Sequence, residues 1–286
     1  MPYTFLRGLV LGIKSFIAFN PLHGGKDIVK SWAMKRKVTH YPIILAPGVF
    51  GFDRKIVSYF LGITHYLNGM GFRVMHTKTI VARVERRALV LKNQIEGYLK
   101  KTGAGKVNIV AHSMGGLDAR YMIAKLDMED RVASLSTIGT PHWGTSIADW
   151  GIKRGGLVLQ LLRGLLKMDT KLIYDLTTES CQQFNEEVEN VSQVKYFTYS
   201  GSNKKLRISP FFWPAHDVIM KSEGENDGLV SVNSARWGAE GVRYMGNFRA
   251  DHLDLMGWNL GLKILRSFDA KRFYHYVAEN VKGAGL

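Results

Sequence analysis

The chain has 286 residues, 46% of them hydrophobic, with 39 lysines and arginines against 24 acidic residues and a formal net charge of +15. This length and hydrophobic content allow one sizeable buried core, so we expect one main domain with insertions. The charge favours anionic partners, but no zinc-finger, helix-turn-helix or aromatic-basic RNA motif accompanies it, and we expect no nucleic-acid partner. Cys181 is the single cysteine, which excludes an intramolecular disulfide.

Residues 1–40 precede the main domain, which we expect to span residues 41–286. The pattern predicts a basic amphipathic helix near the start, followed by a connector with Pro21, Gly24 and Gly25. Contact with a membrane, docking on the protein's own surface and a removable signal peptide are alternatives for this helix. No run of about eighteen uncharged apolar residues is present, so we expect no conventional transmembrane helix.

From Tyr41 onward, short apolar runs alternate with stretches of helical periodicity. Short buried strands separated by helices predict a parallel sheet flanked by helices, an α/β fold. The expected strands are Pro42–Ala46, Phe72–Met75, Val107–Ala111, Val132–Ile138 and Lys195–Tyr199. The expected helices are Val84–Lys101, Gly115–Leu126 and a last one from about Leu260 to Val281.

The segment VNIVAHSMGGLDARYM, residues 107–122, combines a buried strand, a sharp turn and a helix. It predicts a nucleophile elbow, in which Ser113 adopts a strained backbone conformation and exposes its hydroxyl at the end of the strand. The turn requires small residues two positions before and after the serine, and Ala111 and Gly115 meet that demand. His112 adjoins the serine, but neighbouring side chains of such a turn point apart, so we expect the general base from a distant loop.

The helix behind Ser113 directs its first N–H groups at the place where an oxyanion would form, and the N–H of Met114 is the natural donor. A second donor is needed, and the loop after the strand Pro42–Ala46 can supply it. Gly48 and Gly51 on either side of Val49 allow the backbone to approach a substrate closely. We therefore expect the N–H groups of Val49 and Met114 to form an oxyanion hole.

In folds with this elbow the acid and the histidine follow the nucleophile in that order. Asp227 lies in the turn segment EGENDGLV, residues 223–230, and His252 lies in the loop segment ADHLD, residues 250–254. We expect Asp227 to orient the imidazole of His252, which takes the serine proton. Three other acidic residues compete with Asp227 and two other histidines with His252. These alternatives are Glu225, Asp251 and Asp254 for the acid, and His216 and His275 for the base.

Five ordered segments resemble the bacterial family I true lipases of the α/β-hydrolase fold. They are HYPIILAPGVFGFDR, IVAHSMGGLDARY, IGTPHWGTSIADW, ENDGLV and DHLD, spread between about Tyr41 and Trp258. The resemblance implies hydrolysis of triacylglycerol esters by Ser113, Asp227 and His252, without a cofactor in the chemistry. It also implies a structural calcium ion near the histidine loop, with Asp254 matching one carboxylate ligand.

The chain departs from that family at several positions. Pro47 stands where the family usually has histidine, Ala111 where many members have glycine, and Asn233 where relatives with a disulfide have cysteine. The second calcium carboxylate has no clear match in residues 200–214, and Asp217 lies at a different spacing.

An insertion at about residues 150–186 contains an amphipathic stretch, GGLVLQLLRGLLKMD, at residues 155–169. It predicts a helical lid that covers the site in water and turns its apolar face to lipid, although a helix packed on the core fits the pattern too. A lidded lipase acting at a lipid–water interface or an anionic membrane surface is the leading hypothesis. The alternatives are a short-chain carboxylesterase with the same triad and a catalytically silent lipid-binding protein. We expect a secreted or membrane-associated protein of a bacterium rather than a cytoplasmic one.

Overall fold

A computed structural model describes residues 38–49, 58–154, 171–258 and 268–286. Contacts divide the chain into Met1–Val38 and Thr39–Leu286, and the elements below belong to the second unit. The expected N-terminal helix and the stretch expected to form a lid helix both lie outside the described residues.

The centre of the second unit is a six-stranded sheet with the strand order β2-β1-β3-β4-β5-β6, in which every adjacent pair is parallel. The strands are β1 (Ile43–Ala46), β2 (Val74–His76), β3 (Val107–His112), β4 (Val132–Ile138), β5 (Lys195–Ser202) and β6 (Val242–Arg249). Strands β1, β3 and β4 are buried along their whole length. Because all strands run the same way, their carboxyl ends meet at one edge of the sheet, where ligands of open α/β sheets bind.

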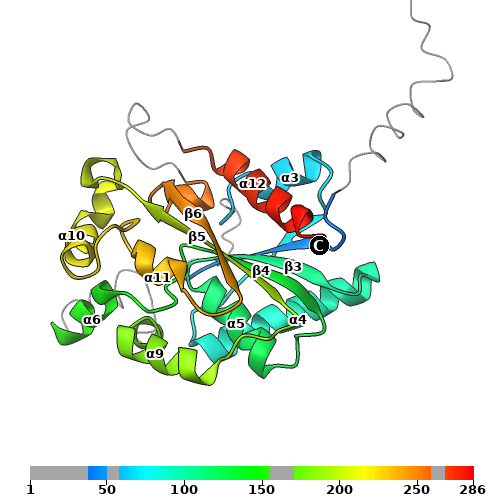
Figure 1. Ribbon diagram of the computed structural model, residues 1–286, viewed down its shortest axis with the longest axis horizontal. Coiled ribbons are helices and arrows are strands. Elements are labelled where there is room, and N and C mark those ends of the chain that lie inside the picture. Colours follow the sequence, from blue (N-terminus) through cyan, green and yellow to red (C-terminus); the bar gives the residue numbers. More distant parts are fainter. Residues whose placement is uncertain (1–37, 50–57, 155–170, 259–267) are drawn as a thin grey trace, which may run out of the picture. The chain divides into compact units, whose positions relative to one another are not determined.

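Helices cover both faces of the sheet, with α3 and α12 on one side and α4 and α5 on the other (Figure 1). The described α-helices are α3 (Ile63–Gly69), α4 (Val84–Thr102), α5 (Gly115–Lys125), α6 (Ser146–Lys153), α8 (Lys171–Tyr174), α9 (Thr178–Glu187), α10 (Trp213–Ser222), α11 (Val232–Arg236) and α12 (Ala270–Gly283). Short 3-10 helices are η1 (Lys205–Arg207), η2 (Pro210–Phe212) and η3 (Asp254–Met256). Helices α6, α10 and α11 gather where the strands end (Figure 1). In the part of the chain that is described, no helix is long and apolar enough to cross a membrane.

A hydrophobic core of buried residues lies between the sheet and the helices α4 and α5. Ile44, Ile109 and Leu135 of three neighbouring strands pack with apolar residues of both helices, such as Ile95 and Met122. This core fixes the position of α5, and therefore of the turn between β3 and α5 that carries the predicted nucleophile.

The five predicted strands and the parallel sheet are present, and the ends of the strands lie within three residues of those predicted. Strand β2 begins at Val74 rather than Phe72, because the side chain of Asn68 both donates to and accepts from the backbone of Val74 and extends the preceding turn. Strand β6 was not predicted: it lies at the edge of the sheet and alternates exposed and half-buried residues, so it has no continuous apolar run. The last helix was predicted from about Leu260: residues 259–267 lie outside the described residues, and α12 begins at Ala270, where Asp269 caps its first turn.

Candidate active site

Ser113 occupies the sharp turn between β3 and α5 in the left-handed backbone region, with φ 55°. Such a conformation is strained for a residue with a side chain and persists only where surrounding contacts hold it. Here the Ser113 N–H donates to the Ile138 carbonyl at 2.9 Å, and the Thr140 hydroxyl donates to the Ser113 carbonyl at 2.7 Å. Ser113 is half-exposed while its neighbours in the turn are buried, so the turn presents this hydroxyl to solvent.

Two glycines allow the turn and the loop after β1 to approach each other closely. A Cβ atom at Gly48 would lie 2.8 Å from Cβ of Ser113, and one at Gly115 would lie 2.6 Å from the Pro47 carbonyl oxygen. Neither space admits a side chain without displacement of the backbone. The loop expected to supply an oxyanion donor therefore lies directly beside the predicted nucleophile.

Asp227 and His252 are paired in the structure. Nδ1 of His252 lies 2.7 Å from Oδ2 of Asp227, and both residues are buried. The other carboxylate oxygen of Asp227 accepts the N–H groups of Leu229 and Val230 at 2.9 and 2.8 Å. These bonds hold the carboxylate in one orientation and stabilise its charge, which suits a group that orients an imidazole.

The competing acids have other partners. Asp251 accepts the N–H and hydroxyl of Ser209, whereas Asp254 accepts the N–H of Asp251. Glu225 is exposed and contacts Ser202. Among the candidates predicted from sequence, only Asp227 contacts the ring of His252 within the described residues.

The competing histidines lie elsewhere. His216, on α10, contacts the Asn203 carbonyl, and His275, on α12, lies 3.6 Å from Glu279. Neither contact involves Ser113, Asp227 or His252.

His112 connects the serine turn to the histidine loop. Its ring centroid lies 4.6 Å from that of His252, and Nδ1 lies 2.7 Å from the hydroxyl of Tyr59. Burial, together with the nearby His252, lowers the pKa of His112 well below its ordinary value, so the ring is neutral. Ser113 follows His112 in the chain, and the His112 ring contacts the His252 ring. Among the described residues, no hydrogen bond joins the side chains of Ser113 and His252.

No motif indicated a role for Tyr59, which is buried beside Gly48. A Cβ at Gly48 would lie 2.8 Å from the Tyr59 hydroxyl oxygen. Burial raises the pKa of Tyr59 above its ordinary range, so its hydroxyl stays protonated. A neutral His112 needs a donor at Nδ1 if its proton is on Nε2, and the Tyr59 hydroxyl supplies one.

The predicted oxyanion donors lie on either side of this arrangement. Val49 follows Gly48, and Met114 follows Ser113 at the start of α5. Within the described ranges, neither N–H donates to an acceptor of the protein. Two free N–H groups beside a half-exposed serine are suited to bind a developing negative charge.

Comparisons with known proteins match the fold and the motifs. A family model described as the alpha/beta hydrolase fold matches residues 76–169. Triacylglycerol lipase of Vibrio cholerae is 32% identical over 288 aligned positions, which cover 87% of this chain and 89% of that protein. Triacylglycerol lipase 2 of Saccharomyces cerevisiae is 34% identical, over 71% of this chain and 63% of the yeast protein.

The chain belongs to the triacylglycerol lipase family. A solved structure of Staphylococcus hyicus lipase has the same fold, with a TM-score of 0.70 and 18% identity over 87% of this chain and 97% of that one. The resemblance to lipases of the α/β-hydrolase fold that the five motifs indicated is confirmed.

The calcium ion implied by the bacterial lipases needs several convergent oxygen ligands. No group of three histidine, cysteine or acidic side chains that could hold a metal ion occurs in the described part of this lipase-family chain. The Asp254 carboxylate is bonded to the Asp251 N–H, and Asp217 is paired with Lys205. We therefore assign no calcium ligand set to this loop, and the role of Asp254 as a metal ligand stays a prediction.

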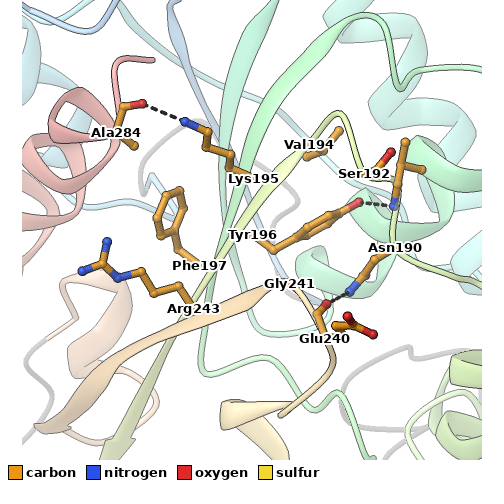
Figure 2. Close-up of a pocket in the computed structure, with 11 residues that line it drawn as sticks. Asn190, Ser192, Val194, Lys195, Tyr196, Phe197, Glu240, Gly241, Arg243 and Ala284 are labelled. Carbon is orange, nitrogen blue, oxygen red and sulfur yellow. Dashed lines mark hydrogen bonds between the residues drawn. The ribbon is translucent and has the colours of Figure 1, made fainter.

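A groove of about 690 Å³ lies at the opposite edge of the sheet, near the amino ends of β5 and β6 (Figure 2). Lys195 in its wall pairs in register with Ser134, which pairs with Asn108 at the start of β3, five residues before Ser113. Three hydrogen bonds join residues of its lining, among them the bond from the Lys195 ammonium to the Ala284 carbonyl at 2.9 Å. This groove is separate from the candidate active site around Ser113.

Proposed function

We propose that the protein hydrolyses carboxylic ester bonds of triacylglycerols through Ser113, His252 and Asp227 and an acyl-enzyme intermediate. The observation that supports this most is the 2.7 Å contact between His252 Nδ1 and Asp227 Oδ2. The ring of His252 packs on that of His112, the residue that precedes Ser113 in the strained turn. The mechanism uses side chains, N–H groups and water, so we propose that its chemistry needs no cofactor.

In the acylation half, the Ser113 oxygen attacks the ester carbonyl carbon while Nε2 of His252 takes the hydroxyl proton. Asp227 stabilises the imidazolium that forms. The carbonyl oxygen becomes an oxyanion held by the N–H groups of Val49 and Met114. When the tetrahedral intermediate collapses, the bond to the alkoxy oxygen breaks and His252 delivers its proton to that oxygen. Diacylglycerol leaves, and the acyl group stays on Ser113.

In the deacylation half, water takes the place of the alcohol. His252 removes a proton from the water, whose oxygen attacks the acyl carbon, and the same N–H groups hold the second oxyanion. Collapse breaks the bond to the Ser113 oxygen, which recovers its proton from His252. The fatty acid leaves and the resting state is restored.

Labelling with a fluorophosphonate tests the nucleophile directly. We expect stoichiometric labelling of Ser113, loss of label in Ser113→Ala, and loss of ester turnover by about a million-fold in that variant. Ser146→Ala, at the start of α6, is the matched control and should label and turn over like the wild type. A chain that folds but neither labels nor hydrolyses any ester would instead be the catalytically silent lipid-binding protein.

Acyl-chain length separates a lipase from a short-chain carboxylesterase with the same triad. We expect hydrolysis of emulsified long-chain triacylglycerol, with a rise in rate when the substrate exceeds its solubility. Turnover confined to soluble short-chain esters would favour the carboxylesterase.

A further inference from the structure

The segment after β5 exposes apolar and basic side chains at the edge of the sheet that holds the proposed active site. Leu206 on η1 and Phe211 on η2 are 76% and 79% exposed, the most exposed large hydrophobic side chains of the described residues. The two residues stand five positions apart in one short segment, and exposed apolar side chains that gather in one region often mark an interaction site. We call Leu206, Phe211 and the basic residues Lys204, Arg207 and Arg249 the rim patch.

The rim patch is held in a fixed conformation. Ile208 and Phe212, which alternate with the exposed residues, are buried, and the Ser209 N–H and hydroxyl both donate to Asp251 at 2.7 and 2.6 Å. The exposure of Leu206 and Phe211 therefore follows from the anchoring of their neighbours and not from a loosely packed segment.

The same anchors join the rim patch to the proposed catalytic loops. Asp251 immediately precedes His252, and Gly228 immediately follows Asp227. A Cβ at Gly228 would lie 2.9 Å from Phe212 Cβ and 3.0 Å from Ile208 Cγ2. The patch therefore lies on the rim of the site.

A basic hollow of about 370 Å³ is lined by residues that lie on both sides of Leu206 in the chain. Lys204, Arg207 and Arg249 line it, with Glu225 as the acidic residue of its wall. None of the three cations makes an ion pair with a described residue, whereas nearby Lys205 is paired with Asp217. The hollow thus carries an excess of positive charge in a chain with a net charge of +15.

We propose that the rim patch docks the protein on a bilayer that contains anionic phospholipid: the basic hollow takes a phosphodiester headgroup, and Leu206 and Phe211 enter the acyl region. Apolar side chains next to unpaired cations match the two layers of such a surface, lipid chains below charged headgroups. The proposal rests on the proposed function for its purpose, since it brings a lipid phase to the mouth of the ester-cleaving site.

Vesicle sedimentation with the full chain tests docking without turnover when Ser113→Ala is the background. We expect tighter partition onto phosphatidylcholine vesicles doped with phosphatidylglycerol than onto phosphatidylcholine alone. Arg207→Gln/Arg249→Gln should weaken partition onto the anionic vesicles by about 25-fold, at about fivefold for each cation. Leu206→Ser/Phe211→Ser should weaken it by at least about tenfold.

Lys100→Gln/Lys101→Gln is the matched control, because both lysines are exposed on the last turn of α4, which leads to the amino end of β3. We expect it to partition within about twofold of its parent, since charge far from the lipid surface contributes little. With Ser113 intact, the patch variants should hydrolyse a soluble short-chain ester at the wild-type rate, which shows that they fold.

Several outcomes would overturn the docking proposal. The first is equal partition onto both vesicle types. The second is partition of the patch variants equal to that of their parent, which is the result expected if residues 1–20 alone bind the vesicles. The third is saturable binding of inorganic phosphate without binding to vesicles. A change in oligomeric state of Leu206→Ser/Phe211→Ser would identify a second copy as the occupant instead. Failure of the proposed function is distinguishable, because it appears as ester turnover that survives Ser113→Ala, or as no labelling and no turnover in the wild type, whatever the partition.

Discussion

Tyr59 and Tyr274 are buried tyrosines that differ in what their hydroxyls contact. The Tyr59 hydroxyl lies 2.7 Å from Nδ1 of His112, whereas that of Tyr274 has no partner among the described residues. Tyr59→Phe should lower kcat by about tenfold with KM nearly unchanged, because one hydrogen bond that positions His112 beside the loop of Gly48 is lost. Steady-state kinetics on a soluble ester measure this split.

Tyr274→Phe removes an equivalent buried hydroxyl and is the matched control. We expect its kcat to equal that of the wild type and its free energy of unfolding to be unchanged or higher, because an unpaired polar atom leaves the core. Equal kcat values for the two variants would show that Tyr59 has no positioning role.

Asp227→Asn tests the acid. The amide keeps the size of the side chain but cannot stabilise the imidazolium or fix the tautomer of His252, so kcat should fall by about 10⁴. Glu225→Gln changes an exposed rival two residues away and should leave kcat unchanged. If the Glu225 variant lost activity and the Asp227 variant kept it, the acid would be misassigned. Both rates are read under single-turnover conditions, where product release does not contribute.

For single residues, contacts between positions close in the sequence could be predicted, whereas contacts between distant positions could not. The strained turn at Ser113 depends on residues within a few positions, so its motif revealed it, and its φ of 55° matches. The pairing of Asp227 with His252 needed the chain order of the fold, since nearby acids fit the local pattern equally well. Tyr59 contacts His112 across 53 positions, and nothing in its surrounding sequence distinguishes it from a core tyrosine.

At the scale of elements, α4 and α5 are joined by a buried ion pair. The Arg87 guanidinium donates to Asp118 at 2.7 Å, and the two side chains are 0% and 4% exposed. Arg87→Met should destabilise the fold by about 3–5 kcal/mol, because the Asp118 carboxylate is left buried without a counter-charge. Arg87→Met/Asp118→Leu should recover most of that lost stability, since burial of an apolar pair carries no penalty for removing charges from water. Urea unfolding of both variants measures the difference.

Strands differ in how visible they are in the sequence. β1, β3 and β4 are buried on both faces, and most residues of each strand are apolar, without an acidic residue, lysine or arginine. β6 pairs on one side only, and Arg243, Asn247 and Arg249 on it face solvent. Charged residues on an edge strand prevent pairing with other chains, and they also remove the apolar pattern by which a strand is predicted.

At the scale of the whole molecule, burial of two histidines makes stability depend on pH. Burial, with His252 near one and Arg120 near the other, lowers the pKa values of His112 and His142 well below their ordinary value. Below about pH 6.5 the unfolded chain therefore binds protons that the folded chain does not. The free energy of unfolding should fall as pH falls through this value, by about 1.4 kcal/mol per pH unit for each histidine.

Asp118 acts in the opposite direction. Burial, partly offset by Arg87, raises the pKa of Asp118 from its ordinary value to about 6, so between about pH 6 and 4 the folded chain binds a proton that the unfolded chain does not. The net slope should therefore level off at about one proton below pH 6, because one of the two protons gained by the unfolded histidines is offset by the proton on folded Asp118. His142→Phe keeps an aromatic ring stacked on Trp237, whose centroid lies 4.2 Å from that of the His142 ring in the wild type. This variant should lower the slope of unfolding free energy against pH by the equivalent of one proton. Urea unfolding between about pH 7 and 5 measures both slopes; parallel curves would mean that His142 takes up its proton in the folded state as well.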